Sequence, residues 1–212
     1  MWRGGLTGDV DNYTSPRWRI GVLGAKESRN NSSLLDMGIT YIPEEQNEQL
    51  STARRALLEP LVEPIFPMGD FQRYRAILDI DGNSWSSRFG LLMCYNSVIL
   101  KVEPKYVDYF FDTLQPWVHY VPVQYDLSDL ITQAAWVLDP RHAAAVQKII
   151  AHANQWCQEY LIEDVVARDL LTVWDAYVEL LERGDPEWQS VWESRREAYF
   201  AALDMVPLST NY

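Results

Sequence analysis

The stretch YRAILDIDGNSWSSRF, from Tyr74 to Phe89, decides how this sequence is interpreted. Its first half, Tyr74–Ile80, is a short apolar run closed by Asp-Gly, which predicts a buried β-strand followed by a turn. Gly82 permits a sharp bend, and the residues after it are small hydrogen-bond donors that lead to Arg88. A helix that begins near Ser86 would complete a cradle for a diphosphate. In an open α/β sheet, ligands bind at the carboxyl ends of strands, where this bend would lie.

Two other interpretations of the same segment stay open. Asp79 and Asp81 would point to the same side of a strand and could hold Mg²⁺ or Mn²⁺ against a diphosphate. Alternatively, the aspartates and serines only cap the turn and the following helix, and Arg88 pairs with a nearby acid. The chain has 30 acidic residues, so an Asp-x-Asp match arises easily by chance, and capping is favoured over the metal.

Further apolar runs place this strand in a layered domain. Ser97–Val102 and Trp117–Val123 predict two more buried strands. Predicted helices from about Ser86 and over Lys105–Leu114 separate the three strands. This alternation predicts an α/β domain with parallel strands. The segment Arg17–Ala25 fits a helix and a strand equally well.

The rest of the chain is predicted to be helical. Asp126 would cap a helix that runs to Leu138, and Asp139-Pro140 is a typical start of the next one. Apolar residues recur at helical spacing in two further segments: Val146, Ile149, Ile150, Ala153 and Cys157, then Val166, Leu170, Val173, Tyr177 and Leu181. Gly184 and Pro186 precede a last helix that ends near Leu203. We therefore expect one domain over residues 1–183 and a helical extension over residues 184–212.

Composition excludes several classes of protein. The chain has 212 residues, 48% of them hydrophobic, and a net charge of −12, most of it between Glu159 and Asp204. An acidic chain of this kind does not favour nucleic-acid binding. Cys94 and Cys157 are predicted to be buried thiols, because two distant cysteines form neither a disulfide framework nor a zinc pattern. The sequence has neither an apolar run long enough for a membrane span nor a signal peptide at its start.

A glycine-rich segment, WRGGLTGD from Trp2 to Asp9, has the same chemistry as the bend after Tyr74–Ile80. It is rich in backbone donors and is followed by Arg17 and Arg19, but it fits neither the dinucleotide nor the P-loop pattern. Lys101 follows a buried strand and either reaches an anionic ligand or caps the sheet edge. His119 lies among apolar residues and is expected to be a core histidine or to support a site rather than to act as a base.

Three blocks of the sequence resemble glycosyltransferase family 90 in the same order. They are WRGGLTG, then YRAILDIDGNSWSSRF, then the long block from Leu91 to Leu130 that contains PWVHYVPV and DLSDL. The family covers fungal capsule-associated glycosyltransferases and the animal protein O-glucosyltransferases and O-xylosyltransferases. The resemblance runs from Trp2 to about Leu181.

The resemblance implies a GT-B architecture in which this chain supplies a Rossmann-like, donor-binding C-terminal half, followed by several helices. It implies inverting transfer of glucose or xylose from a UDP-sugar to a hydroxyl group of a protein or glycan acceptor, with no required metal or other cofactor. It also implies work in the secretory pathway, in the endoplasmic reticulum or Golgi. The donor-binding residues implied are Gly5, Arg17, Asn83, Ser84, Trp85, Ser86, Ser87 and Arg88.

The catalytic base implied by the resemblance is an aspartate upstream of Met1, so no catalytic residue is assigned in this chain. Two outcomes are then open. The chain is either the donor-binding half of an active enzyme, or an inactive donor-binding or scaffold remnant. In both cases the missing N-terminal half or an oligomer partner would cover part of its surface.

Overall fold

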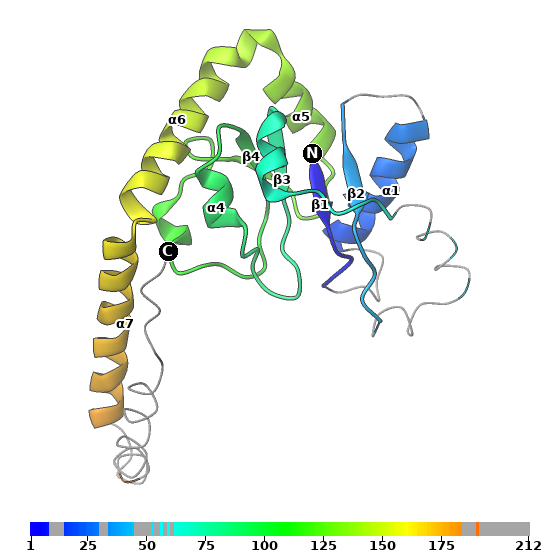
Figure 1. Cartoon of the computed structure of the whole chain (residues 1–212). Coiled ribbons are helices and arrows are strands. Elements are labelled where there is room, and N and C mark those ends of the chain that lie inside the picture. The colour runs from blue at the N-terminus through cyan, green and yellow to red at the C-terminus, as the bar shows by residue number, and fades with distance from the viewer. Residues whose placement is uncertain are drawn as a thin grey trace. The chain divides into compact units, whose positions relative to one another are not determined.

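The computed structural model describes residues 1–8, 15–29, 34–44 and 62–183, together with the single positions 52, 56, 59 and 190. The chain divides into two units, Met1–Leu161 and Ile162–Tyr212. The first unit is a mixed α/β structure with parallel sheets and several helices, which is compatible with a Rossmann-like fold (Figure 1). The domain boundary predicted after residue 183 stays a prediction, because most of residues 184–212 lie outside the described residues.

The described residues of the first unit contain five strands, all paired in parallel. One sheet pairs β1 (Trp2–Gly4) with β2 (Met37–Ile39), and the other pairs β3 (Ala76–Asp79), β4 (Val98–Val102) and β5 (Val121–Val123). Two backbone hydrogen bonds join the sheets, from the amino group of Met1 to Ala76 O and from Leu78 N to Met1 O, each 3.0 Å. The strand order is therefore β2-β1-β3-β4-β5. This is a doubly wound order whose direction of winding reverses between β1 and β3.

All three strands predicted from apolar runs are present, each somewhat shorter than its run. The undecided N-terminal segment forms a helix, α1 (Pro16–Arg29). The helix predicted near Ser86 begins three residues later and is short, α4 (Phe89–Met93). The prediction of a helix over Lys105–Leu114 is wrong, since only the 3-10 turn η3 (Phe111–Thr113) forms there.

The later helices follow their predicted order. They are α5 (Leu130–Leu138), the 3-10 turn η4 (Pro140–His142), α6 (Ala143–Tyr160) and α7 (Glu163–Arg183). The carboxylate of Asp139 accepts from the backbone N–H of Arg141, which confirms it as a cap. Asp126 instead accepts from Ser128 N in the turn before α5. The helix predicted to end near Leu203 lies outside the described residues.

The sheet is buried on both faces, as its nearly continuous apolar strands indicate. Leu78, Leu100 and Val121 belong to one hydrophobic cluster, which also contains residues of α1 and α5. Ile77 and Ile99 belong to a second cluster with residues of α4. Residues of α6 pack into both clusters. The helices that pack on both faces hold the strands in place. The carboxyl ends of the strands, and the loops that follow, therefore lie at one edge of the sheet.

The two cysteines form a disulfide, so the prediction of free thiols is wrong. Cys94 follows α4 and Cys157 lies on α6, and the packing of these two helices brings their Cα atoms to 5.3 Å. That separation is within the normal range for a disulfide. Two distant cysteines cannot form a framework, but they can form one bridge once the fold places them together.

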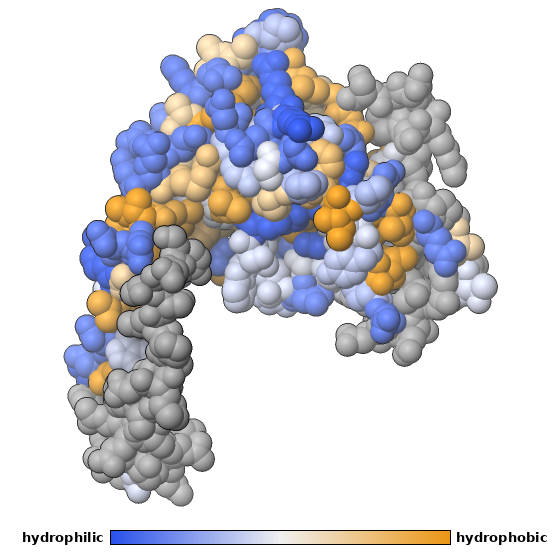
Figure 2. Space-filling model, viewed as in Figure 1, coloured by the Kyte–Doolittle hydropathy of each residue, from blue (hydrophilic) through white to orange (hydrophobic). Residues whose placement is uncertain are grey.

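Helix α7 belongs to the second unit and exposes much of its apolar side. The stripe predicted from Val166 to Leu181 forms on one helix, but Leu170 is 67% exposed and Tyr177 is 53% exposed. Figure 2 shows hydrophobic residues among hydrophilic ones along this helix. Among the described residues, no helix is both long and apolar enough to cross a bilayer.

Candidate functional site

Two cavities lie where the loops after β1 and β3 meet, at the point where the strand order reverses. The first, which we call the arginine cleft, has a volume of about 460 Å³. Its walls come from β1 and the loop after it, from the segment after β2, and from the bend Gly82–Arg88. All eight residues predicted to bind the donor line this one cleft: Gly5, Arg17, Asn83, Ser84, Trp85, Ser86, Ser87 and Arg88.

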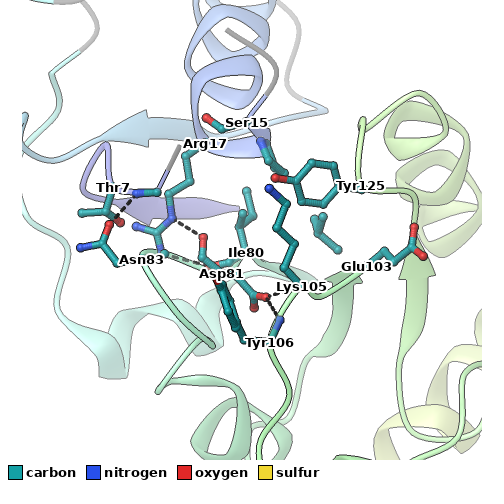
Figure 3. A pocket seen from close by; sticks show the side chains of 14 residues that line it. Thr7, Ser15, Arg17, Ile80, Asp81, Asn83, Glu103, Lys105, Tyr106 and Tyr125 are labelled. Atoms are coloured by element: carbon teal, nitrogen blue, oxygen red, sulfur yellow. Dashed lines mark hydrogen bonds between the residues drawn. The ribbon is translucent and has the colours of Figure 1, made fainter. Parts of the chain in front are cut away.

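The second cavity, which we call the small pocket, adjoins the same bend and has a volume of about 180 Å³ (Figure 3). Thr7, Arg17, Gly82 and Asn83 line both cavities. The small pocket adds the segment after β4 and Tyr125, whose ring lies 4.9 Å from the ammonium of Lys105. Its walls therefore combine aromatic rings with polar groups.

A buried ion network forms the floor under the bend. Lys101 on β4 is 3% exposed and donates to Asp79 at 2.8 Å and to Asp81 at 2.9 Å. Asp79 is fully buried and also accepts from the hydroxyl of Ser86 at 2.5 Å. Burial alone would lower the pKa of Lys101, but the two carboxylates outweigh it and raise that pKa above 10.5. Lys101 thus stays charged and holds the end of β3 in place.

These contacts bear on the metal interpretation of Asp79 and Asp81. Both carboxylates bind Lys101, and Asp81 also accepts from the backbone N–H of Lys105 at 3.1 Å. No group of His, Cys, Asp or Glu side chains suited to a metal ion occurs among the described residues. The observed partners favour a structural role for the two aspartates.

Arg17, on α1, connects the loop after β1 to the loop after β3. Its guanidinium donates to the carbonyls of Gly5 at 2.7 Å, Ile80 at 3.0 Å and Asp81 at 2.7 Å, and Figure 3 draws Arg17 beside Ile80 and Asp81. Burial, followed by the positive charge of Arg88, lowers the pKa of Arg17 to about 10. These bonds use three of the five N–H groups of the guanidinium, so Arg17 shapes the wall of the cleft, and its role in donor binding stays a prediction.

Glycines are required where the two loops approach each other. A Cβ at Gly82 would lie 2.9 Å from Thr7 Oγ1 and 3.2 Å from a nitrogen of Arg17. A Cβ at Gly5 would lie 2.4 Å from the ring of Tyr41, which covers this residue. The amide of Gly8 donates to Asn83 Oδ1 at 2.7 Å and ties the loops across the bend. Asn83 is therefore both a wall residue and a bridge.

The rest of the bend faces the open cleft. Ser84, Trp85 and Ser87 are exposed, and the indole of Trp85 is 49% exposed. Arg88 is half-buried and donates to the carbonyl of Arg3 at 2.7 Å. No ion pair between described residues involves Arg88, so a carboxylate does not neutralise it. The cleft thus presents one positive charge, small hydroxyl groups and an aromatic surface.

Several lining residues were not predicted. They are Thr40, Tyr41, Ile65, Phe66, Met68 and Phe71 in the arginine cleft, and Lys105, Tyr106 and Tyr125 in the small pocket. The last three follow β4 and β5, so the rule for the carboxyl ends of strands could have found them. The others follow β2, a three-residue strand without a sequence signal. His119 is half-buried and accepts from Gln115 N, so it is not a core histidine, and its role in supporting a site stays a prediction.

Comparisons with known proteins show the family to which the chain belongs. The model of "Glycosyl transferase family 90" matches residues 28–193. The chain belongs to glycosyltransferase family 90. Asn83–Arg88 lie within the matched residues, whereas Gly5 and Arg17 lie before them.

Individual relatives point the same way. The chain is 30% identical to Protein O-glucosyltransferase 2 of Danio rerio over 155 residues, which are 73% of this chain and 29% of that protein. It is 32% identical to human Protein O-glucosyltransferase 3 over 146 residues, 68% of this chain and 24% of that protein. Uncharacterized protein 179R of Invertebrate iridescent virus 6 is 29% identical over 189 residues, 78% of this chain and 15% of that protein. The chain therefore spans less than a third of these relatives.

Proposed function

We propose that this family 90 chain is the donor-binding part of a glycosyltransferase, and that its arginine cleft binds the diphosphate of a UDP-sugar. The observation that carries the proposal is Arg88, a half-buried guanidinium that pairs with no carboxylate among the described residues, beside the exposed hydroxyl groups of Ser84 and Ser87. A planar guanidinium suits two phosphate oxygens, and positive charge stabilises the UDP that leaves. The proposal gives Arg17, Gly5 and Ser86 the task of holding this wall.

The neighbouring small pocket suits the base of the same ligand. Tyr106 and Tyr125 offer aromatic surface, and Asn83 and Ser15 offer polar groups at its edge (Figure 3). We assign the uracil ring to this pocket and the diphosphate to the cleft, because both cavities share the bend at Gly82. The sugar would then lie on the cleft side, near Trp85.

The remaining parts of the proposal rest on family membership. They are a GT-B architecture, transfer of glucose or xylose with inversion to a hydroxyl group of a protein or glycan, and no required metal or other cofactor. The base that accepts the proton of the acceptor hydroxyl is not assigned to any described residue. A chelator-sensitive transfer would contradict the metal-free mechanism and favour Asp79 and Asp81 as ligands.

The test of donor binding is calorimetry with UDP. Arg88→Ala should weaken binding by about 1.5–3 kcal/mol, the range for hydrogen bonds to a charged group. Arg88→Lys keeps the charge and loses the planar fork, so its affinity should be intermediate. Arg141→Ala is the matched control, because Arg141 pairs with Asp139 at the surface after α5. Equal UDP affinity in the wild type and Arg88→Ala would refute the role of Arg88.

A second candidate is a non-catalytic scaffold. The exposed apolar residues of α7 favour it, since surfaces of this kind drive association. Assays with UDP-glucose and UDP-xylose, on this chain and on longer forms of the gene, separate the two. Turnover by any form that binds UDP through Arg88 would exclude the scaffold.

We further propose that the protein works in the secretory pathway. The disulfide between Cys94 and Cys157 supports this, because such bridges persist in oxidising compartments. Titration of thiols in protein taken from its native cells tests the idea. Two free thiols in the native protein would contradict it.

A further inference from the structure

A third cavity is lined by the end of β4 and by residues before, on and after β5, and it has a volume of about 630 Å³. We call it the Trp117 groove. It shares no residue with the arginine cleft and only Glu103 with the small pocket. Its walls include Val107, Trp117, Tyr120, Gln124, Asp129 and Gln133.

Trp117 is held in an unfavourable conformation with its ring at the surface. Its φ is 64°, in the left-handed region that a bulky residue rarely adopts, and its side chain is 46% exposed. A short turn imposes this conformation, because Trp117 N donates to Tyr120 O at 2.7 Å. Glycine would adopt it without strain, so the turn itself gains nothing from the indole.

The ring of Trp117 is braced from one side. The indole of Trp136 on α5 contacts it in an edge-to-face arrangement, with 5.2 Å between centroids and 81° between planes. Trp136 in turn stacks on His142 at 4.6 Å. Strained and braced side chains that remain exposed are typical of binding sites. The exposed indole of Trp117 lines the groove.

The polar groups of the groove are amides and carboxylates. Asp129, which lines the same groove, accepts from Gln124 N at 2.9 Å and from Gln133 Nε2 at 3.2 Å, and these bonds fix the orientation of its carboxylate. Glu103 is exposed at the edge. The ammonium of Lys101, the cation in this lining, is bound to Asp79 and Asp81 beneath the neighbouring bend. The groove thus disfavours phosphates and other anions.

We propose that the Trp117 groove binds a neutral saccharide, with one pyranose ring stacked on the indole of Trp117. A pyranose has an apolar C–H face that fits an aromatic ring, and equatorial hydroxyl groups that suit carboxylate and amide partners. Asp129, Gln124 and Glu103 supply such partners around the ring. This site is separate from the UDP site, so it does not depend on the proposed function.

The test uses the indole ¹H–¹⁵N resonances of the full 212-residue chain. Trp117→Phe and Trp85→Phe assign two of these signals. Methyl β-D-glucopyranoside, methyl β-D-xylopyranoside and cellobiose should shift the Trp117 signal saturably and leave the Trp85 signal in place. UDP should shift the Trp85 signal. A chain that responds to saccharides but not to UDP would refute the UDP proposal alone, and the reverse result would refute the groove alone.

Trp117→Gly separates binding from folding. Glycine adopts the left-handed φ freely, so the fold should survive while the stacking surface is lost. Saccharide affinity, read from the indole signal of the neighbouring Trp136 because both variants lack that of Trp117, should fall by about tenfold or more in Trp117→Gly, whereas Trp117→Phe should retain most of it. Undiminished affinity in Trp117→Gly would overturn the proposal. So would a Trp117 signal that shifts with a proline-rich peptide at concentrations where no saccharide moves it.

Discussion

The bend after β3 contains two groups of polar side chains, a floor and a rim, which differ in their partners although their residues alternate along one short segment. Asp79, Asp81 and Ser86 form the floor, where each side chain has a protein partner. Ser84, Ser87 and Arg88 form the rim, where the side chains face an open cleft. The floor uses its polarity to set the shape of the backbone, and the rim has polarity available for a ligand.

The comparison teaches that residue type alone does not identify a binding residue. Ser86 and Ser87 are neighbours of identical chemistry, but Ser86 is 5% exposed and bound to Asp79 whereas Ser87 is exposed. Arg17 and Arg88 differ in the same way. Arg17 donates to three carbonyls, and Arg88 donates to one. Substitutions in the floor should lower stability, and substitutions in the rim should lower affinity.

The largest expected effect is that of Lys101→Met. It leaves Asp79 and Asp81 buried without their cation, and breaking a buried pair in this way costs about 3–5 kcal/mol. Methionine preserves much of the packing of the stem against Phe89, whose ring lies 4.8 Å from the ammonium. Urea unfolding of wild type, Lys101→Met and the surface variant Lys148→Met measures the loss. Equal stability of all three would show that the floor is not held by charge.

The stabilisation that Lys101 gains from Asp79 and Asp81 should not change with pH across the neutral range. The two carboxylates raise the pKa of Lys101 in the folded protein above the ordinary value of 10.5. The stabilisation is therefore fully present below the pKa of the unfolded chain and is lost only as pH rises through the folded pKa. The stability difference between wild type and Lys101→Met should stay constant from about pH 6 to 9.

The difference between floor and rim also explains what the sequence could and could not predict. β3, β4 and β5 were predictable because burial on both faces makes a strand continuously apolar. The gathering of Gly5, Arg17 and Asn83–Arg88 in one cleft was predictable because parallel strands end at one edge, although their ligand is still a prediction.

Other features depend on tertiary contacts that leave no local pattern. Ser86 bonds Asp79, so the backbone turns until Phe89 and the predicted helix starts late. The disulfide depends on the packing of α4 on α6, across a sequence separation of 63. Nothing local in the sequence signals that the guanidinium of Arg17 donates to three backbone carbonyls.

Ser86→Ala and Ser87→Ala are a matched pair that tests the comparison directly. Ser86→Ala leaves an acceptor of the buried Asp79 unsatisfied and should cost about 1–3 kcal/mol of stability. Ser87→Ala should change stability by less than about 0.5 kcal/mol, because the side chain is exposed. Its UDP affinity should instead fall by about 0.5–1.5 kcal/mol, the net value of one hydrogen bond.

Thermal unfolding and UDP calorimetry on both serine variants give the two readouts. Folded Ser86→Ala should still bind UDP, although its bend is less well ordered. The assignment of floor and rim would be reversed if Ser87→Ala were the less stable variant and Ser86→Ala lost affinity without losing stability.

An effect smaller than that of the Lys101 floor is expected from a third group of charges, which connects the strands behind the cleft. Asp36, just before β2, accepts from Arg3 on β1 at 2.5 Å and from the hydroxyl of Tyr74, just before β3. Partial burial alone would raise the pKa of Asp36, but these hydrogen bonds outweigh it and hold the pKa below 3.8. Asp36 is 40% exposed, so solvent screens the pair and Asp36→Asn should cost only about 1 kcal/mol.

The sign of the pH dependence distinguishes this group from the Lys101 floor. Because the folded pKa of Asp36 is depressed, its contribution is present above the unfolded pKa near 3.8 and is lost as pH falls through the folded value. Urea unfolding from pH 6 downward should show wild type and Asp36→Asn converging in acid, while Asp70→Asn, at a surface pair with Arg73, changes little throughout. A stability difference between wild type and Asp36→Asn that persists undiminished in acid would mean that asparagine fails for steric reasons. The charge of Asp36 would then not hold β1 between β2 and β3.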